Sequence, residues 1–331
     1  MMGASLARPT SSRPWRSISS LALLTFPLAG CNPIQSALHP AGVDAEALSG
    51  LTWFMFGGAV MVWAIVMGAT IWAVLAKKRV RDERFADRFI LFGGVAFPTV
   101  GLAILLVYGL SLLPDWNASR PADLRVHVRA EQFWWRFGYE LPDGSVLETA
   151  NELHLPNNAT AEFVLTSTDV IHSFWIPSLG GKMDAIPGRT NLLRLTPTRA
   201  GTYRGVCAEF CGPSHTFMAF PVIVHEAADY EAWLAAEQQP ATATSEAFLA
   251  AGCGACHTVR GVSQAGSVGP DLTHFASRST IGAATLPNTR DNLLRWITAP
   301  TSIKPGVGMP AFGHLLEAER AAIVDYLGGL R

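Results

Sequence analysis

The sequence predicts two membrane-spanning helices, then an all-β domain, then a mostly helical domain, along 331 residues. Three features support this fold class. Two long apolar stretches occupy residues 51–75 and 89–113, alternating hydrophobicity begins at Leu124, and a C-x-x-C-H motif precedes a C-terminal stretch with helical periodicity. At about 100 to 200 residues per domain, a chain of this length accommodates two or three domains.

The first thirty residues have the layout of a secretory signal, with three arginines before a short apolar run at 18–28. The run is too short to span a bilayer, and we expect residues 1–30 to be removed. It ends in Leu28-Ala29-Gly30-Cys31, which resembles the lipobox of bacterial lipoproteins. The resemblance implies that Cys31 is lipidated and begins the mature chain. The alternative is an ordinary signal followed by a buried or unpaired cysteine.

Residues 31–118 are predicted to form a transmembrane hairpin. At about 1.5 Å per residue, the apolar stretches 51–75 and 89–113 can each cross a hydrocarbon core about 30 Å thick. The loop between them is basic, with Lys77, Lys78, Arg79, Arg81, Arg84 and Arg88. Basic loops stay in the cytoplasm, so everything after Pro114 is predicted to lie on the periplasmic, outer side of a bacterial inner membrane. Two buried core helices are the alternative, but they would need a large soluble domain to cover them.

The charge balance argues against a nucleic-acid partner. The chain has 25 Lys and Arg against 26 Asp and Glu, a net charge of -1, and its basic residues gather only in the loop of the hairpin. Proteins that bind nucleic acid usually carry a basic patch or stripe. The apolar surplus near the N-terminus indicates the membrane instead.

Residues 119–226 are predicted to be an all-β domain. Leu124, Val126 and Val128 alternate with polar residues, and after a bulge near Glu131 the period continues through Phe133, Trp135, Phe137 and Tyr139. Further apolar strands are predicted at 161–166, 191–195 and 220–224, with turns at 142–144 and 156–158. Short strands at this spacing indicate a sandwich or a barrel.

Residues 227–244 are predicted to contain a short helix at 229–237 and a linker at 238–244 (QQPATAT). The last domain, 245–331, starts with a helix at Ser245-Glu246. It closes with a helix at 317–327, in which Ala321, Val324 and Leu327 share one face.

Cys253-Gly254-Ala255-Cys256-His257 fits the C-x-x-C-H motif of covalent haem attachment. The two thiols form thioethers to the haem, and His257 becomes an axial iron ligand. A thioredoxin-like dithiol would need a βαβ context, and a zinc site would need a second ligand pair, neither of which this region supplies.

Met309 is the predicted second axial ligand, because it is the only methionine after Met218. Methionine opposite histidine is typical of electron carriers of high potential. His274 and His314 are the competing residues. The stretch from Val268-Gly269-Pro270-Asp271-Leu272 to the final helix resembles a class I cytochrome c domain, which is all-α and in which Pro270 would lie against the haem on its histidine side.

A second cluster, Cys207, Cys211, His215 and Met218, follows the spacing C-x3-C-x3-H-x2-M. Thiolate, thioether and imidazole together favour copper, and such sets form electron-transfer sites. One ligand is missing, and the second cysteine needs a role, either as a disulfide partner or as a bridge between two metals. A disulfide suits the oxidising compartment, and structural zinc is a further alternative that would leave Met218 unused.

The segments IHSFWIPSLGGKMDAIPGR and GTYRGVCAEFCGPSHTFM resemble subunit II of haem-copper cytochrome c oxidases, from the first span to about Val224. The resemblance implies a cupredoxin sandwich with a dinuclear copper centre, called copper A. Its ligands would be two bridging thiolates, two histidines, a weak methionine and a backbone carbonyl: Cys207, Cys211, His172, His215, Met218 and Glu209. Reasoning from the residues alone leaves His154 as a competitor of His172, since both adjoin strands.

The same resemblance implies further roles. The Glu209 side chain would reach a magnesium ion shared with the catalytic subunit, and Asp184 and Arg189 fall in the matching interface segment. Gln132-Phe133-Trp134-Trp135 resembles a surface patch that receives electrons from soluble cytochrome c, although Phe133 stands where the family commonly has tryptophan. Phe133 and Trp135 are core aromatics in the alternative interpretation. Many family members have a glutamate at a proton entry point before the second span. This chain has Asp87 and Phe89 there instead, so no proton path is predicted at this place.

Together these features imply subunit II of a bacterial terminal oxidase with a fused cytochrome c domain, as in caa-type oxidases. Its partners would be the catalytic subunit I, subunit III, and as donor either a cytochrome c or a quinol–cytochrome c reductase. No residue of this chain is predicted to be catalytic, since its spans contain no second haem ligand pair and no cluster of ionisable residues.

A membrane-tethered copper and haem relay, or an assembly factor for another complex, is the rival hypothesis. Nitrous oxide reductase shares the copper loop but needs a second copper cluster, for which this chain has no residues. Quinol oxidase subunits lack the copper ligands.

Overall fold

The computed structural model describes residues 33–76, 82–112 and 122–331, which belong to one compact unit, Pro33–Arg331. The predicted signal segment and Cys31 lie outside the described residues, as does the basic core of the loop at 77–81.

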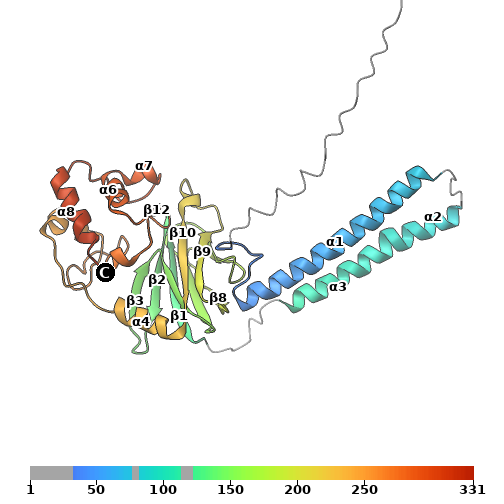
Figure 1. The fold of residues 1–331 in the computed structure, drawn as a ribbon, viewed down its shortest axis with the longest axis horizontal. Helices are drawn as coiled ribbons and strands as arrows, with labels where there is room; N and C mark the ends of the chain where they lie inside the picture. Colours follow the sequence, from blue (N-terminus) through green and yellow to red (C-terminus); the bar gives the residue numbers. More distant parts are fainter. Residues whose placement is uncertain (1–32, 77–81, 113–121) are drawn as a thin grey trace, which may run out of the picture. The chain divides into compact units, whose positions relative to one another are not determined.

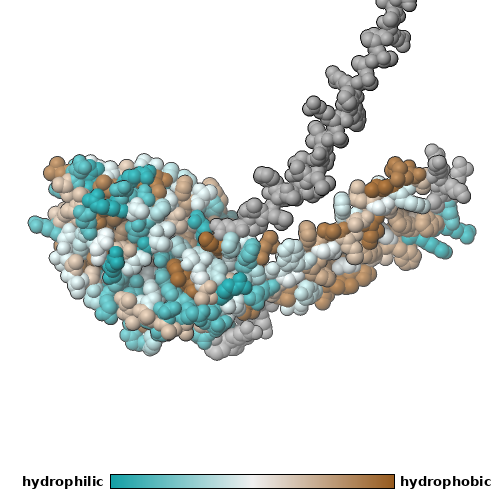
Figure 2. All heavy atoms as spheres, in the orientation of Figure 1, coloured by the Kyte–Doolittle hydropathy of each residue, from teal (hydrophilic) through white to brown (hydrophobic). Residues whose placement is uncertain are grey.

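The two apolar stretches are helical. Helix α1 spans Val43–Leu75, and the second stretch is formed by α2 (Glu83–Phe89), a π-helical segment η1 (Ile90–Ala96) and α3 (Phe97–Ser111). Both are long and apolar enough to cross a membrane, with 33 and 29 residues. Figure 2 shows hydrophobic side chains exposed along both helices. Exposed apolar surface of this extent is suited to lipid rather than to water.

Helix α1 begins eight residues earlier than the apolar run predicts, at Val43 rather than residue 51. Its first turns pack on the β domain, where Ala45 and Ser49 are buried. The preceding residue, Gly42, pairs with Pro197, and a Cβ atom there would meet the Leu179 carbonyl oxygen at 2.5 Å. Tertiary contact therefore extends the helix beyond its membrane-spanning part.

The β domain contains two five-stranded sheets within residues 122–225, drawn in green to yellow in Figure 1. One has the order β3-β2-β1-β5-β8, with β1 Leu124–Glu131, β2 Trp134–Glu140, β3 Val146–Ala150, β5 Ala161–Ser167 and β8 Asn191–Leu195. The other has the order β4-β10-β9-β6-β7, with β4 Leu153–Pro156, β6 His172–Trp175, β7 Met183–Ala185, β9 Gly201–Cys207 and β10 Ala219–His225. Buried residues of both sheets form one core, so the domain is a cupredoxin-like sandwich.

The prediction of one long strand with a bulge near Glu131 is wrong. Strands β1 and β2 are separate and antiparallel, with Glu131 opposite Trp134. Gln132 and Phe133 form the turn, and the Gln132 amide groups donate to Asp169 Oδ2 at 2.6 Å and to the Cys211 carbonyl at 2.5 Å. A two-residue turn preserves the alternation of apolar residues, so periodicity alone cannot distinguish it from a bulge.

The C-terminal domain is mostly helical and has its own core. Its helices are α5 (Glu246–Ala250), α6 (Arg290–Thr298), α7 (Pro300–Ile303) and α8 (Glu317–Leu327), with short 3₁₀ turns at Cys253–Ala255 and Phe275–Ser277 and a small ribbon of β11 (Thr280–Ile281) and β12 (Leu286–Pro287). Ser245 caps α5 by accepting from the Phe248 amide. Helix α4, Ala227–Glu237, precedes this domain and packs Trp233 and Leu234 on the sandwich core.

Candidate metal sites

Five side chains with sulfur or imidazole donors converge in the β domain. His172, Cys207, Cys211, His215 and Met218 form this set, which we call the soft-ligand cluster. Cys207 Sγ lies 3.9 Å from Cys211 Sγ and 3.7 Å from His172 Nδ1, and Cys211 Sγ lies 3.6 Å from His215 Nδ1 and 3.9 Å from Met218 Sδ. The Glu209 carbonyl oxygen lies 3.2 Å from Cys207 Sγ.

Sheet pairing brings these residues together. Cys207 ends β9 and Met218 directly precedes β10, and the Cys207 amide donates to the Met218 carbonyl at 2.9 Å to close the intervening loop. His215 lies on a 3₁₀ turn, His215–Phe217, within that loop. His172 starts β6, which pairs with β9 so that Phe174 is opposite Cys207. A histidine 35 residues away in sequence thus reaches the loop through a strand pairing.

The cluster is suited to holding metal. His172, Cys207 and Cys211 are all buried, and their donor atoms lie within 4.8 Å of one another. The two cysteines are free thiols. Since thiolate sulfur binds such metals at about 2.3 Å, two sulfurs separated by 3.9 Å can share a metal ion between them. Each imidazole Nδ1 faces one of the two sulfurs, so the residues present fit a soft metal such as copper.

The charges in the cluster favour the metal-binding form of one thiol. The hydrogen bond with Cys211, together with the one to His172, lowers the pKa of the Cys207 thiol although burial opposes it. The same contact, with burial, raises the pKa of Cys211. A thiolate is the form that binds metal.

Asp169 is a site residue that sequence reasoning missed. Its Oδ1 lies 2.8 Å from His172 Nε2, on the side of the ring away from Cys207. Burial lowers the pKa of His172, but hydrogen bonds to Cys207 and Asp169 outweigh it and raise the pKa overall. A carboxylate behind a ligating imidazole fixes the ring orientation and leaves Nδ1 free for metal. The signal in the sequence was an acidic residue three positions before the histidine.

His154, the competitor of His172, is engaged elsewhere. Its Nδ1 lies 2.8 Å from His225 Nε2, and its ring stacks on Trp233 with the centroids 4.2 Å apart. His154 lies on β4, which pairs with β10, so the structure brings His172 rather than His154 to the cysteines.

The predicted electron-accepting aromatics are not together on the surface. Trp135 is fully buried, and Phe133 is 2% exposed, so a surface role is wrong for both; they are core aromatics. Trp135 contacts the cluster from the core side, with its Nε1 3.5 Å from the Met218 carbonyl and its ring edge-on to His172. Trp134 is partly exposed and lies under the Arg136 guanidinium at 4.7 Å.

Asp184 and Arg189, the predicted interface residues, lie on and just after β7. Asp184 is half-buried and forms an ion pair with Lys182 at 3.1 Å. A hydrogen bond with Ser173 is the main cause that lowers the pKa of Asp184, and Lys182 lowers it further. Arg189 is exposed. Both remain predictions as interface residues.

The C-x-x-C-H segment lies between α5 and a tight loop. His257 Nδ1 lies 2.8 Å from the Pro270 carbonyl oxygen, and a Cβ atom on Gly269 would meet the ring at 2.5 to 3.0 Å. Burial lowers the pKa of His257, which favours the neutral imidazole. Because Nδ1 is engaged by the Pro270 carbonyl, Nε2 is the nitrogen left to bind iron. Cys253 is half-buried and Cys256 exposed, and both are free thiols, as thioether attachment to a haem requires.

The three candidates for the second axial ligand differ in their surroundings. Met309 packs partly buried against the core of the C-terminal domain. The buried His274 hydrogen-bonds through Nε2 with the Gln239 carbonyl at 2.9 Å, and His314 is exposed beside Phe312. The residues present therefore fit a haem held by Cys253, Cys256 and His257.

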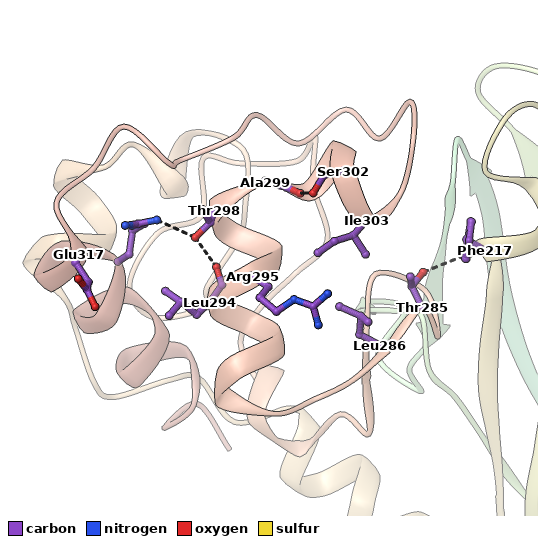
Figure 3. A pocket seen from close by; sticks show the side chains of 11 residues that line it. Phe217, Thr285, Leu286, Leu294, Arg295, Thr298, Ala299, Ser302, Ile303 and Glu317 are labelled. Carbon is purple, nitrogen blue, oxygen red and sulfur yellow. Dashed lines mark hydrogen bonds between the residues drawn. The ribbon is translucent and has the colours of Figure 1, made fainter.

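An open cavity of about 660 Å³ lies elsewhere, lined by α6, α7, the start of α8 and Phe217. Figure 3 shows the Arg295 side chain extending from α6 toward Leu286. None of the predicted copper or haem ligands lines it.

Two family models match the part of the chain after the hairpin. The family model "Cytochrome C oxidase subunit II, periplasmic domain" matches residues 137–227, and the model "Cytochrome c" matches residues 241–331. Cytochrome c oxidase subunit 2 of Alkalihalophilus pseudofirmus is 32% identical over 96% of this chain and 98% of its own length. The subunit 2 of Bacillus subtilis is 33% identical over 96% and 98%. The solved periplasmic domain of subunit II of the cytochrome oxidase of Bradyrhizobium japonicum is 31% identical, covering 36% of this chain and 95% of that domain, with a TM-score of 0.34.

Proposed function

Because the chain belongs to the cytochrome c oxidase subunit 2 family, with a cytochrome c domain at its C-terminus, we propose that it carries electrons from a donor to the catalytic subunit I of a bacterial terminal oxidase. The chain is a subunit of an oxidoreductase complex. In the proposed path it accepts an electron at its cytochrome c domain, transfers it to the soft-ligand cluster, and delivers it to subunit I. Subunit I reduces oxygen to water and translocates protons.

The geometry of the soft-ligand cluster is the observation that carries this proposal. Its two thiols lie 3.9 Å apart, with one imidazole facing each. Copper bound there, as a pair bridged by Cys207 and Cys211, would supply one-electron redox chemistry with little change in geometry. His172, His215, Met218 and the Glu209 carbonyl complete the proposed ligand set. The core of the sandwich supports the strands that carry these donors. A fixed ligand geometry suits electron transfer, because little rearrangement accompanies the change of charge.

In the cytochrome c domain, Cys253 and Cys256 would hold a covalent haem c, with His257 and Met309 as axial ligands. Haem iron with this pair of ligands supplies one-electron chemistry at high potential. The Pro270 carbonyl and Gly269 position His257. The chain thus has a donor site and an acceptor site of its own.

The surface next to the cluster supports a partner subunit at that place. Val170 and Ile171 directly precede His172, Phe210 directly precedes Cys211, and their exposed fractions are 38%, 46% and 75%. Apolar side chains exposed beside a metal ligand set favour a protein interface over water. We propose that subunit I covers this surface, that the Glu209 side chain binds a shared magnesium ion, and that Asp184 and Arg189 lie at the same interface.

The remaining parts of the proposal concern location and partners. The hairpin would anchor the chain in the inner membrane with both soluble domains on the periplasmic side, and lipidated Cys31 would be a second anchor. Subunit III would complete the complex, and a cytochrome c or a quinol–cytochrome c reductase would be the donor.

The experiment is metal and haem analysis with electron paramagnetic resonance on the complex purified from membranes in detergent. Two coppers in the chain per covalent haem c, with the unpaired electron split by both copper nuclei, are expected. One copper or none, with Cys207 and Cys211 joined as a disulfide, would contradict the proposal.

Copurification separates the oxidase subunit from the rival relay or assembly factor. An oxidase subunit is expected to purify with a large polytopic protein that reduces oxygen. A chain that carries both cofactors but purifies alone would favour the relay.

A further inference from the structure

A buried lysine lies where the cytochrome c domain meets the loop of the soft-ligand cluster. Lys304 follows α7 and is 1% exposed. Its Nζ donates to three backbone carbonyls: Phe133 at 2.7 Å, Phe217 at 2.8 Å and Gly282 at 2.7 Å. An ammonium group has three donors, so all of them are used.

The three carbonyls come from different domains. Phe133 and Phe217 belong to the β domain, and Gly282 belongs to the cytochrome c domain, as does Lys304 itself. A buried ammonium is costly unless it is fully hydrogen-bonded, so its position depends on both domains being in place. Removing the ammonium would take the Lys304 hydrogen bond from the buried Phe133 carbonyl, which carries a cost, whereas the Phe217 and Gly282 carbonyls also accept from the Thr285 hydroxyl.

The residues after Lys304 make the same contact. The Ser214 hydroxyl donates to the Pro305 carbonyl at 2.6 Å. Gly306 has a positive φ of 78°, and a Cβ atom there would lie 3.2 Å from Pro213 Cγ and 3.3 Å from Phe133 Cε2. Segment 304–306 is therefore packed against segment 213–217, which lies between Cys211 and Met218.

This contact joins the two proposed redox sites through short stretches of chain. Phe217 directly precedes Met218, and Lys304 lies five residues before Met309. The Thr285 hydroxyl of the cytochrome c domain also donates to the Phe217 carbonyl, at 3.5 Å. The contacts of Arg136 with the Ser267 carbonyl at 2.8 Å and of the Ser279 hydroxyl with Glu152 at 3.0 Å involve neither the loop 207–218 nor the segment leading to Met309.

We propose that Lys304 is a positioning residue for electron transfer within the chain: its ammonium clamps the cytochrome c domain onto the loop of the soft-ligand cluster. This inference rests on the proposed function. In the step that it positions, the iron of the haem loses one electron and the copper centre gains it, and no proton or atom is transferred. Since transfer occurs from the docked arrangement, its rate scales with the docked fraction.

The test compares Lys304→Met with Arg290→Met in the full oxidase complex. Methionine keeps much of the apolar stem and removes the three donors. Arg290 is an exposed residue of the same domain, paired with Asp325 at 2.9 Å, so its substitution controls for the loss of one positive charge. Copper content, haem content and the copper resonance signal are measured first, because failure of the proposed function would already show in the unmodified chain.

Two readouts then test the clamp. Hydrogen exchange at the amides of 214–218 and 282–286 is expected to accelerate at least about tenfold in Lys304→Met, the factor that corresponds to about 1.4 kcal/mol of docking free energy. After flash reduction of the haem, electron transfer to copper is expected to slow by a similar factor and to become dependent on solvent viscosity, because the domains must now dock first. Arg290→Met is expected to behave like the unmodified chain in both.

Three outcomes would overturn the proposal. Exchange and transfer rates within twofold of the unmodified chain would show that Lys304 does not position the domains. An equal effect in Arg290→Met would assign the change to net charge. Loss of copper or haem from Lys304→Met would give Lys304 a part in building one site rather than in joining the two.

Discussion

The soft-ligand cluster and the haem-attachment segment differ in how their ligands are brought together. Cys253, Cys256 and His257 lie within five residues, and local backbone contacts from Gly269 and Pro270 hold the histidine. His172 and Cys207 are 35 residues apart and meet only because β6 pairs with β9 in the sandwich. A site made of contiguous residues can therefore form in a small domain with few long-range contacts. A site assembled from different strands depends on a rigid core that holds those strands in register.

The largest expected effect is the loss of one cofactor while the other is kept. Cys207→Ser removes one of the two thiols proposed to bridge copper, and a hydroxyl is a poor ligand for copper, so loss of copper is expected while covalent haem is retained. Copper analysis and the haem absorption spectrum of the purified complex measure this.

Cys253→Ala is the reciprocal control. It removes one thioether, so loss or weakening of haem attachment with full copper content is expected. If either substitution emptied both sites, the two sites would not be independent, and the comparison above would fail.

Trp135→Ala tests the dependence of the cluster on the core. Trp135 is fully buried, with its ring packed edge-on against Phe174, Phe220 and His172. Truncation of a core aromatic to alanine costs about 3 to 5 kcal/mol. We expect the free energy of unfolding of the β domain to fall by that amount, as measured by thermal denaturation. We also expect the variant to retain copper less well. A variant of unchanged stability would mean that the core does not support the site in this way.

Asp169→Asn should have a smaller effect, confined to copper. Loss of the carboxylate behind His172 Nε2 weakens the orientation of the ring and the basicity of Nδ1. Substitutions of this kind lower metal affinity by about tenfold to a hundredfold. Competition with a copper chelator measures the change, and an affinity equal to that of the unmodified protein would remove Asp169 from the site.

The smallest expected effect is the pH dependence contributed by Glu162, far from both sites in the sheet of β1 and β5. Burial opposes ionisation, but hydrogen bonds from Arg194 and Arg125 outweigh it and hold the pKa of Glu162 below its usual 4.5. A carboxyl whose pKa is lower when folded adds stability above its unfolded pKa and loses it as the pH falls through its folded pKa.

We therefore expect the free energy of unfolding to fall less steeply between neutral and acidic pH in Glu162→Gln than in the unmodified chain. Identical pH profiles would show that the Arg–Glu–Arg group does not contribute.

The haem motif, the hairpin and the outline of the β domain could be predicted because each depends on local pattern. Covalent haem attachment needs its residues at fixed short spacing, and a bilayer selects for length and hydrophobicity. The turn at Gln132 and Phe133 could not be predicted, because its polar groups are satisfied by Asp169 and Cys211, which are distant in sequence. The early start of α1 depends likewise on contact with the sandwich.

The sequence by itself determined which ligand types this protein has and that two sets of them exist, since side-chain chemistry and short spacings do not depend on the fold. Tertiary structure alone decided that His172 rather than His154 faces the cysteines, because strand pairing selects one neighbour among many. It also decided that Trp135 is buried and that Lys304 reaches the loop of the soft-ligand cluster. A lysine in a stretch rich in proline and glycine gives no sign that three carbonyls from two domains will surround its ammonium group.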